Sequence, residues 1–139
     1  MIPQNIFEAF EKSNPNPKGS ATSCLRNLGI SESSQFGEFH CEFWNHSLLC
    51  DSSGSKNKLF DLEEICDFLD YLHTELEVPD EYISLDSMEG EGFYLYNRKN
   101  ESVYDVNFSD INNLIEGKHP PKWKDFYAFL EWYITPEDD

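Results

Sequence analysis

Basic residues are scarce in this chain, and between Asp61 and Glu91 there is neither a Lys nor an Arg. The same segment holds twelve carboxylates, and the whole chain has 27 Asp and Glu against 10 Lys and Arg, for a formal charge of −17. Proteins bind nucleic acids and anionic membranes through a footprint of Lys and Arg. The scarcity of basic residues therefore argues against DNA, RNA and membranes as partners, and it favours a partner that is itself a basic protein.

Long hydrophobic runs and an export signal are also missing. No stretch approaches the ~18 consecutive apolar residues of a membrane span. The segment from Met1 to Asn5 has neither a basic region nor an apolar one of the kind found in signal peptides. Aromatic residues make up 15% of the chain, enough for a hydrophobic core and too many for a disordered protein. We therefore expect a cytoplasmic protein with one domain over residues 1–139, as a monomer or weak dimer.

No C-x-x-C pair occurs, although the chain has four cysteines, and this absence weakens the case for a metal site. His40, Cys41, His46 and Cys50 lie close together in the sequence, but no second ligand pair follows at zinc-finger spacing. Without an export signal, a disulfide framework is not expected either. The sequence favours buried free thiols and solvated histidines, with no metal and no cofactor. The cysteines in question are Cys24, Cys41, Cys50 and Cys66.

Catalytic motifs are absent as well. The chain has no Gly-rich phosphate loop, no G-x-S-x-G and no H-x-E followed by C-x-x-C. Glu89 and Glu91 flank a glycine and could form an acid pair, but no base, nucleophile or metal ligand set accompanies them. We therefore expect no enzymatic activity and no catalytic residues, and a hydrolase that uses Glu89 or Glu91 is a weaker alternative.

The first half of the chain shows helical periodicity. Apolar residues recur at helical spacing in residues 5–12, 33–44 and 61–77. The third segment is the clearest, because Asp61 and Glu64 have capping-box spacing and Val78-Pro79 follows its end. Its apolar stripe consists of Leu62, Ile65, Leu69, Leu72 and Leu76.

After residue 80 the period changes to two. Residues 82–85, 93–96 and 103–108 are predicted strands, and residues 97–101 form a hairpin loop in which Asn100 best tolerates a left-handed conformation. A last helix, over residues 124–133, is expected to pack on the sheet. This order of helices, meander and closing helix predicts an α+β domain. For the strand aromatics, packing in the core is favoured over an exposed platform. They are Phe93, Tyr94, Tyr96 and Tyr104.

The second half of the chain also resembles the SUKH superfamily. The resemblance lies in the strand at Tyr82–Leu85, the turn and aromatic strand at Glu89–Tyr96, the hairpin partner at Val103–Val106 and the closing segment Trp123–Tyr133. Phe36–Phe39 and Leu59–Ile65 fit upstream elements of the family less distinctly, so that the resemblance spans residues 30–134 and leaves residues 1–30 unassigned. It implies a sheet with flanking helices and no active site. Most bacterial members resemble immunity proteins encoded beside polymorphic toxins, whereas fungal relatives act in cell-wall regulation.

Charge and resemblance together predict an immunity protein that binds a cognate toxin, a basic nuclease or a nucleic-acid deaminase, through an acidic surface. Glu63 and Glu64 are expected to stabilise a helix N-terminus instead. Two alternatives stay open: a regulatory or scaffold module of the same fold without a toxin partner, and a charge run that is merely a solvated face. The predicted contact residues are Asp67, Asp70, Glu75, Glu77, Asp80, Glu81, Asp86, Glu89 and Glu91.

Overall fold

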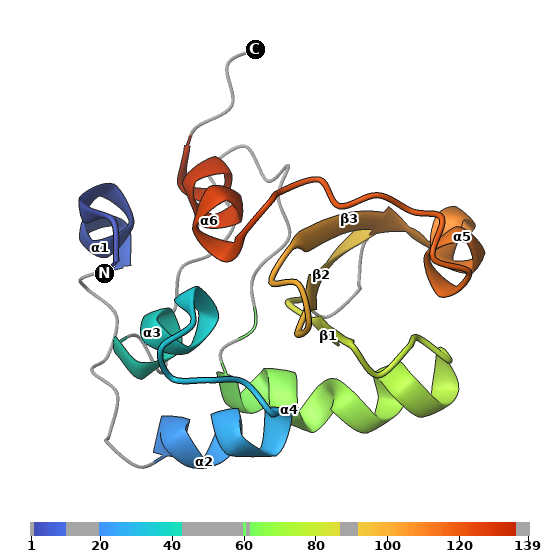
Figure 1. The fold of residues 1–139 in the computed structure, drawn as a ribbon, viewed down its shortest axis with the longest axis horizontal. Helices are drawn as coiled ribbons and strands as arrows, with labels where there is room; N and C mark the ends of the chain where they lie inside the picture. The colour runs from blue at the N-terminus through green and yellow to red at the C-terminus, as the bar shows by residue number, and fades with distance from the viewer. Residues whose placement is uncertain (1, 11–19, 43–59, 61, 87–91, 136–139) are drawn as a thin grey trace.

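A computed structural model describes residues 2–10, 20–42, 60, 62–86 and 92–135. In this part of the chain, helices surround a small antiparallel sheet, so the predicted α+β class is confirmed (Figure 1). The elements, in chain order, are α1 (Gln4–Phe10), α2 (Ser20–Leu28), α3 (Gln35–Glu42), α4 (Leu62–Asp70), the π-helical turn η1 (Tyr71–Glu75), β1 (Tyr82–Ser84), β2 (Gly92–Asn97), β3 (Val103–Asn107), the 3₁₀ turn η2 (Phe108–Asp110), α5 (Ile111–Ile115) and α6 (Phe126–Ile134).

The three strands form the predicted meander in the order β1-β2-β3. In the β2–β3 hairpin the Asn97 side chain accepts hydrogen bonds from the backbone N–H groups of Lys99 and Asn100, at 2.8 and 3.1 Å. Asn100 in turn accepts one from the N–H of Ser102, at 2.8 Å. The left-handed residue of this loop is Glu101, with φ of 64°, rather than Asn100, the residue of the loop that best tolerates that conformation. Asn100 serves the turn through its side chain instead.

Both faces of the sheet are covered, and the side-chain alternation of the strands divides the core into two clusters. Ile83, Tyr94 and Tyr96 pack with residues of α3 and α6. Residues of the opposite face, among them Phe93 and Tyr104, pack with Leu72 of η1 and Leu114 of α5. All four strand aromatics are at most 5% exposed. Core packing is therefore confirmed for them, and the alternative of an exposed aromatic platform on the strands is wrong.

The closing helix packs on the sheet as predicted. The rings of Phe126 and Phe129 contact those of Tyr96 and Tyr94, with centroids 5.8 and 5.1 Å apart. The helix begins after Asp125, whose carboxylate accepts a hydrogen bond from the N–H of Ala128 at 2.8 Å. This N-cap fixes where α6 starts, because it satisfies one of the donors that a first helical turn leaves unpaired.

The helix predicted over residues 61–77 is present, but part-way along it changes from an α-helix to a π-helix. It runs as an α-helix to Asp70 and then widens into η1, where the N–H of Leu76 donates to the carbonyl of Tyr71 at 3.2 Å. Of the predicted apolar stripe, Leu62, Ile65 and Leu72 are buried, whereas Leu69 and Leu76 are half-buried and pack against the two core clusters. Asp61, the predicted N-cap, lies outside the described residues.

In the described part of the chain, α2, α5 and the 3₁₀ turn η2 were not predicted, and η2 begins at Phe108, which was predicted to end a strand. Helix α2 lies in the part of the chain that the sequence left unassigned, yet its Leu25 and Leu28 are each 1% exposed. Helix α5 has five residues, of which only Leu114 is buried, so its pattern is too short to show a period. The helices predicted over residues 5–12, 33–44 and 124–133 are present as α1, α3 and α6, although the described parts of α1 and α3 are shorter.

Candidate protein-binding surface

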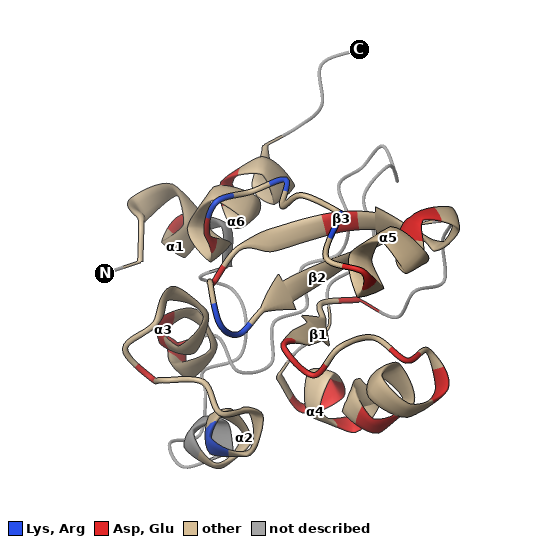
Figure 2. Ribbon diagram, turned by 45° about the vertical axis from the view of Figure 1, so that its right-hand side comes forward, with Lys and Arg blue, Asp and Glu red and all other residues tan. Residues whose placement is uncertain are grey.

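Helix α4 and the turn that follows it present carboxylates opposite their buried stripe. Asp67, Asp70 and Glu75 are exposed, whereas Ile65 and Leu72 of the same elements are buried. Several Asp and Glu residues lie along α4 and the following turn, as the red segments of Figure 2 show. The pattern follows from helix geometry, since residues off the 3-4 apolar spacing must point away from the core.

The chain after η1 continues this acidic face. Glu77 is exposed and takes a left-handed backbone conformation with φ of 56°. The Asp80 side chain is 93% exposed, and its carboxylate lies 3.7 Å from Nδ1 of His73. We call the exposed set of Asp67, Asp70, Glu75, Glu77 and Asp80 the acidic surface. The ion pairs that lysines form in the described part of the chain lie elsewhere, at Glu116–Lys118 and Asp105–Lys122.

Glu81 is less available than these five residues. It is half-buried, and its Oε2 accepts a hydrogen bond from the side-chain amide of Asn97 at 2.9 Å. The neighbouring Arg98 guanidinium donates to the backbone carbonyls of Leu28, at 2.7 Å, and Asp80. These bonds hold the 80–81 turn against the end of α2 and the hairpin, so Glu81 has a structural role at the edge of the acidic surface.

Asp86 does not belong to the acidic surface. It is 1% exposed, and its Oδ2 accepts a hydrogen bond from the backbone N–H of Tyr94 at 3.0 Å. The prediction that Asp86 contacts a partner directly is therefore wrong, because the carboxylate extends the strand pairing between β1 and β2 instead. Glu89 and Glu91 lie outside the described residues.

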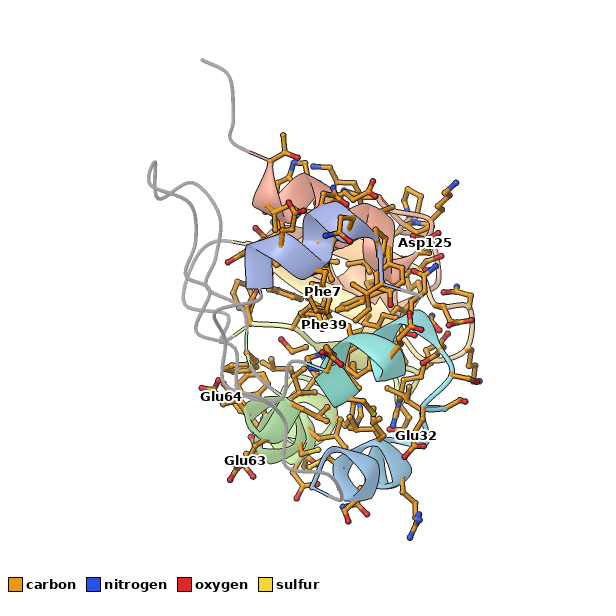
Figure 3. The ribbon with its side chains drawn as sticks, turned by 90° about the vertical axis from the view of Figure 1, so that its left-hand side faces the viewer. Phe7, Glu32, Phe39, Glu63, Glu64 and Asp125 are labelled. Atoms are coloured by element: carbon orange, nitrogen blue, oxygen red, sulfur yellow. The ribbon has the colours of Figure 1, made fainter. Side chains whose placement is uncertain are left out.

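Glu63 and Glu64 lie where the sequence predicts them. Both are in the first turn of α4, both are exposed, and both point away from the body of the protein (Figure 3). Carboxylates at this position stabilise a helix through its macrodipole, which at an exposed site contributes about 0.3–1 kcal/mol.

An exposed aromatic residue within the acidic surface was missed by the sequence analysis. Tyr71 is 46% exposed, and its ring stacks on that of Phe68 with centroids 5.3 Å apart. The signal was present in the sequence, because Phe68 and Tyr71 are spaced three apart and both lie off the leucine stripe. Aromatic residues three apart on a helix are neighbours, so a pair beside the stripe indicates a second apolar contact.

The cysteines and histidines do not assemble into a metal site in the described part of the chain. His40 is 2% exposed and packs against the ring of Phe36, with centroids 4.4 Å apart, so the prediction of a solvated histidine is wrong here. Cys24, Cys41 and Cys66 are half-buried and belong to no disulfide among the described residues. Burial raises the pKa of Cys66 to about 12 and raises that of Cys41, which keeps both thiols protonated at neutral pH. His46 and Cys50 lie outside the described residues.

A hollow of about 550 Å³ lies between the start of α3 and the β2–β3 hairpin. Ser31, Ser34, Arg98 and Lys99 are among the residues that line it. Arg98 is already used by two backbone carbonyls, and Lys99 shares the hollow with Glu101. Most of its lining is polar or charged, whereas small-molecule pockets are lined mainly by apolar and aromatic side chains, so the hollow does not resemble such a pocket.

Comparisons with known proteins do not assign the chain to a family: no family model matches it, and no match is found among the curated proteins. The resemblance to the SUKH superfamily therefore stays a prediction. In the described part of the chain, no helix is both long and apolar enough to cross a membrane.

Proposed function

We propose that this protein is an immunity protein of the SUKH type, which binds a cognate toxin in the cytoplasm and neutralises it. The observation that carries the proposal is the acidic surface on α4, η1 and the turn before β1, together with the formal charge of −17. A toxin that acts on nucleic acid has to present a basic cleft to bind phosphates. A nuclease or a nucleic-acid deaminase is therefore the class of toxin that this surface suits best.

The mechanism that we propose is steric and electrostatic, with no chemistry performed by the immunity protein itself. Carboxylates that face a basic cleft attract it over a distance and raise the association rate, toward ~10⁸–10⁹ M⁻¹s⁻¹ at low salt. Fast association is useful against a toxin that has already entered the cell. Once bound, the protein covers the cleft, so that the nucleic acid can no longer enter.

The first experiment is a pull-down of the tagged protein from its native host at low salt. We expect one basic, toxin-like domain in near-equal amount, which is released as the salt concentration rises because charge attraction is screened. Expression of that toxin should stop growth, and co-expression of this protein should restore it. Recovery of several partners of micromolar affinity, or failure to restore growth, would instead support a regulatory scaffold.

Charge reversals then locate the contact. We expect Asp70→Lys and Asp80→Lys each to weaken toxin binding about three- to tenfold, mainly through slower association. Glu131→Lys is the matched control, because Glu131 is exposed on α6, away from the acidic surface, and its reversal changes the net charge equally. Surface plasmon resonance at two salt concentrations measures both rates. If all three reversals weaken binding equally, net charge alone drives it and the acidic surface is not the contact.

A further inference from the structure

Three aromatic rings pack against one another in a row that runs from the edge of the core to the acidic surface. Phe60 and Phe68 have centroids 5.5 Å apart, and Phe68 and Tyr71 lie 5.3 Å apart with only 16° between their planes. Phe60 and Phe68 are half-buried, whereas Tyr71 is 46% exposed. The inner rings therefore hold the Tyr71 ring in place, and a held ring loses little conformational freedom when a partner binds.

The backbone at Tyr71 is also unusual. Tyr71 is the first residue of the π-helical turn η1, and the next residue, Leu72, is fully buried. The buried leucine fixes the backbone while the tyrosine side chain faces solvent. Turns of this type are rare and occur frequently at functional sites, because they re-aim side chains that a regular helix would place elsewhere.

Carboxylates flank the exposed ring along the helix. Asp67 precedes Tyr71 by four residues and Glu75 follows it by four, and both are exposed. Residues four apart are neighbours on one face of an α-helix, which applies to Asp67 and Tyr71. From Tyr71 the chain is π-helical, and Glu75 is the last residue of that turn. Exposed carboxylates therefore flank Tyr71 on both sides in the sequence, and the segment from Asp61 to Glu91 holds no Lys or Arg.

This combination favours one side chain of a partner. A guanidinium group is planar and stacks on an aromatic ring, and its N–H groups can donate to a carboxylate at the same time. A lysine ammonium is a compact, strongly hydrated charge and gains less from such a site. We propose that Tyr71 is the central anchor of the acidic surface and that it receives an arginine side chain of a basic protein partner.

This inference rests on the proposed function only in requiring a protein partner, and it can be tested without the toxin. The probe is a labelled peptide of Arg-Gly-Ser repeats, with a Lys-Gly-Ser peptide of equal charge for comparison, and binding is followed by fluorescence anisotropy at low salt. Tyr71→Ala leaves the net charge unchanged, so any loss of binding reports on the ring. Circular dichroism and thermal unfolding establish that each variant is folded.

We expect the arginine peptide to bind more tightly than the lysine peptide. Tyr71→Ala should weaken arginine-peptide binding about two- to fivefold, the effect of an exposed cation–π contact. Tyr71→Phe should bind as the wild type does, because the ring is retained. The matched control is Phe108→Ala, which removes another exposed aromatic ring, 41% exposed, that lies beyond β3. Unchanged binding by Tyr71→Ala, or an equal loss in Phe108→Ala, would overturn the inference.

The toxin pull-down separates this inference from the proposed function. If a toxin is recovered and Tyr71→Ala binds it as tightly as the wild type does, the function stands and the anchor is wrong. If no toxin is recovered while the arginine peptide still depends on Tyr71, the anchor stands and its partner is a basic protein of another kind.

Discussion

At the scale of single residues, Asp70 and Asp86 form an instructive pair. Both lie in the segment from Asp61 to Glu91. Asp70 is exposed on α4, whereas Asp86 is 1% exposed and accepts a hydrogen bond from the N–H of Tyr94. Removing a buried acceptor leaves its donor without that bond, which costs more than the bond itself contributes. Their side chains are thus equal in charge and opposite in role.

We therefore expect Asp86→Ala to lower the free energy of unfolding by about 1–3 kcal/mol. Asp70→Ala should change it by less than about 0.5 kcal/mol, because surface substitutions away from special features have small effects. Urea unfolding followed by circular dichroism measures both. Equal stability of the two variants would contradict the structural role of Asp86.

At the scale of elements, the loop after α2 approaches α3 very closely. A Cβ atom added at Gly37 would lie 2.1 Å from the carbonyl oxygen of Ser31 and 2.8 Å from Cα of Glu32. Both of these are backbone atoms, so neither can move aside as a flexible side chain would. The glycine is therefore required in α3 for packing, although glycine is a poor helix former.

Gly37→Ala tests this contact, because two effects predict opposite signs. Helix propensity alone would stabilise the variant by about 1 kcal/mol. We expect instead a loss of about 1–3 kcal/mol in the free energy of unfolding, since the added methyl group overlaps backbone atoms. Ser23→Ala, at an exposed position of α2, is the control and should be nearly neutral. A higher free energy of unfolding for Gly37→Ala would show that the loop moves aside and makes room for the added methyl group.

At the scale of the whole molecule, hydrogen bonds join α3 to α6, two helices that are far apart in the sequence. The Tyr127 hydroxyl donates a hydrogen bond to the carboxylate of Glu38, and the N–H of Tyr127 donates to the side chain of Gln35 at 2.8 Å. The bond from Tyr127 lowers the pKa of Glu38 below its usual 4.5. A carboxylate whose pKa is lower in the folded state stabilises the fold above its unfolded pKa, and this contribution is lost as the pH falls through the folded pKa.

Tyr127→Phe should therefore cost about 1 kcal/mol or less at pH 7, since solvent reaches the half-buried Glu38. The difference from the wild type should stay constant down to about pH 5 and shrink below the usual pKa of 4.5 as Glu38 becomes protonated. Urea unfolding at a series of pH values measures it. Glu38→Gln is the control, because it removes the titrating group. A difference that does not change with pH would exclude a role for the ionised carboxylate.

Much of the fold was predictable because local periodicity encodes it. The leucine stripe of α4 and the alternation in β2 and β3 depend only on residues that are near one another in the sequence. Helix α2 has such a pattern, with Leu25 and Leu28 three apart and both buried, but the sequence analysis left this part of the chain unassigned. The π turn at Tyr71 was not predictable in this way, because it changes the number of residues per turn by only about one and leaves the apolar spacing nearly intact.

The candidate site was predictable in charge but not in detail. The sequence by itself determined the excess of carboxylates and the helix that carries several of them, since composition and helical period are properties of the chain. Only the tertiary structure decided that Asp86 is buried, that His40 lies in the core and that Tyr71 is exposed to solvent. The physical reason is that burial depends on segments distant in the sequence, such as β2 over Asp86 and α6 over His40.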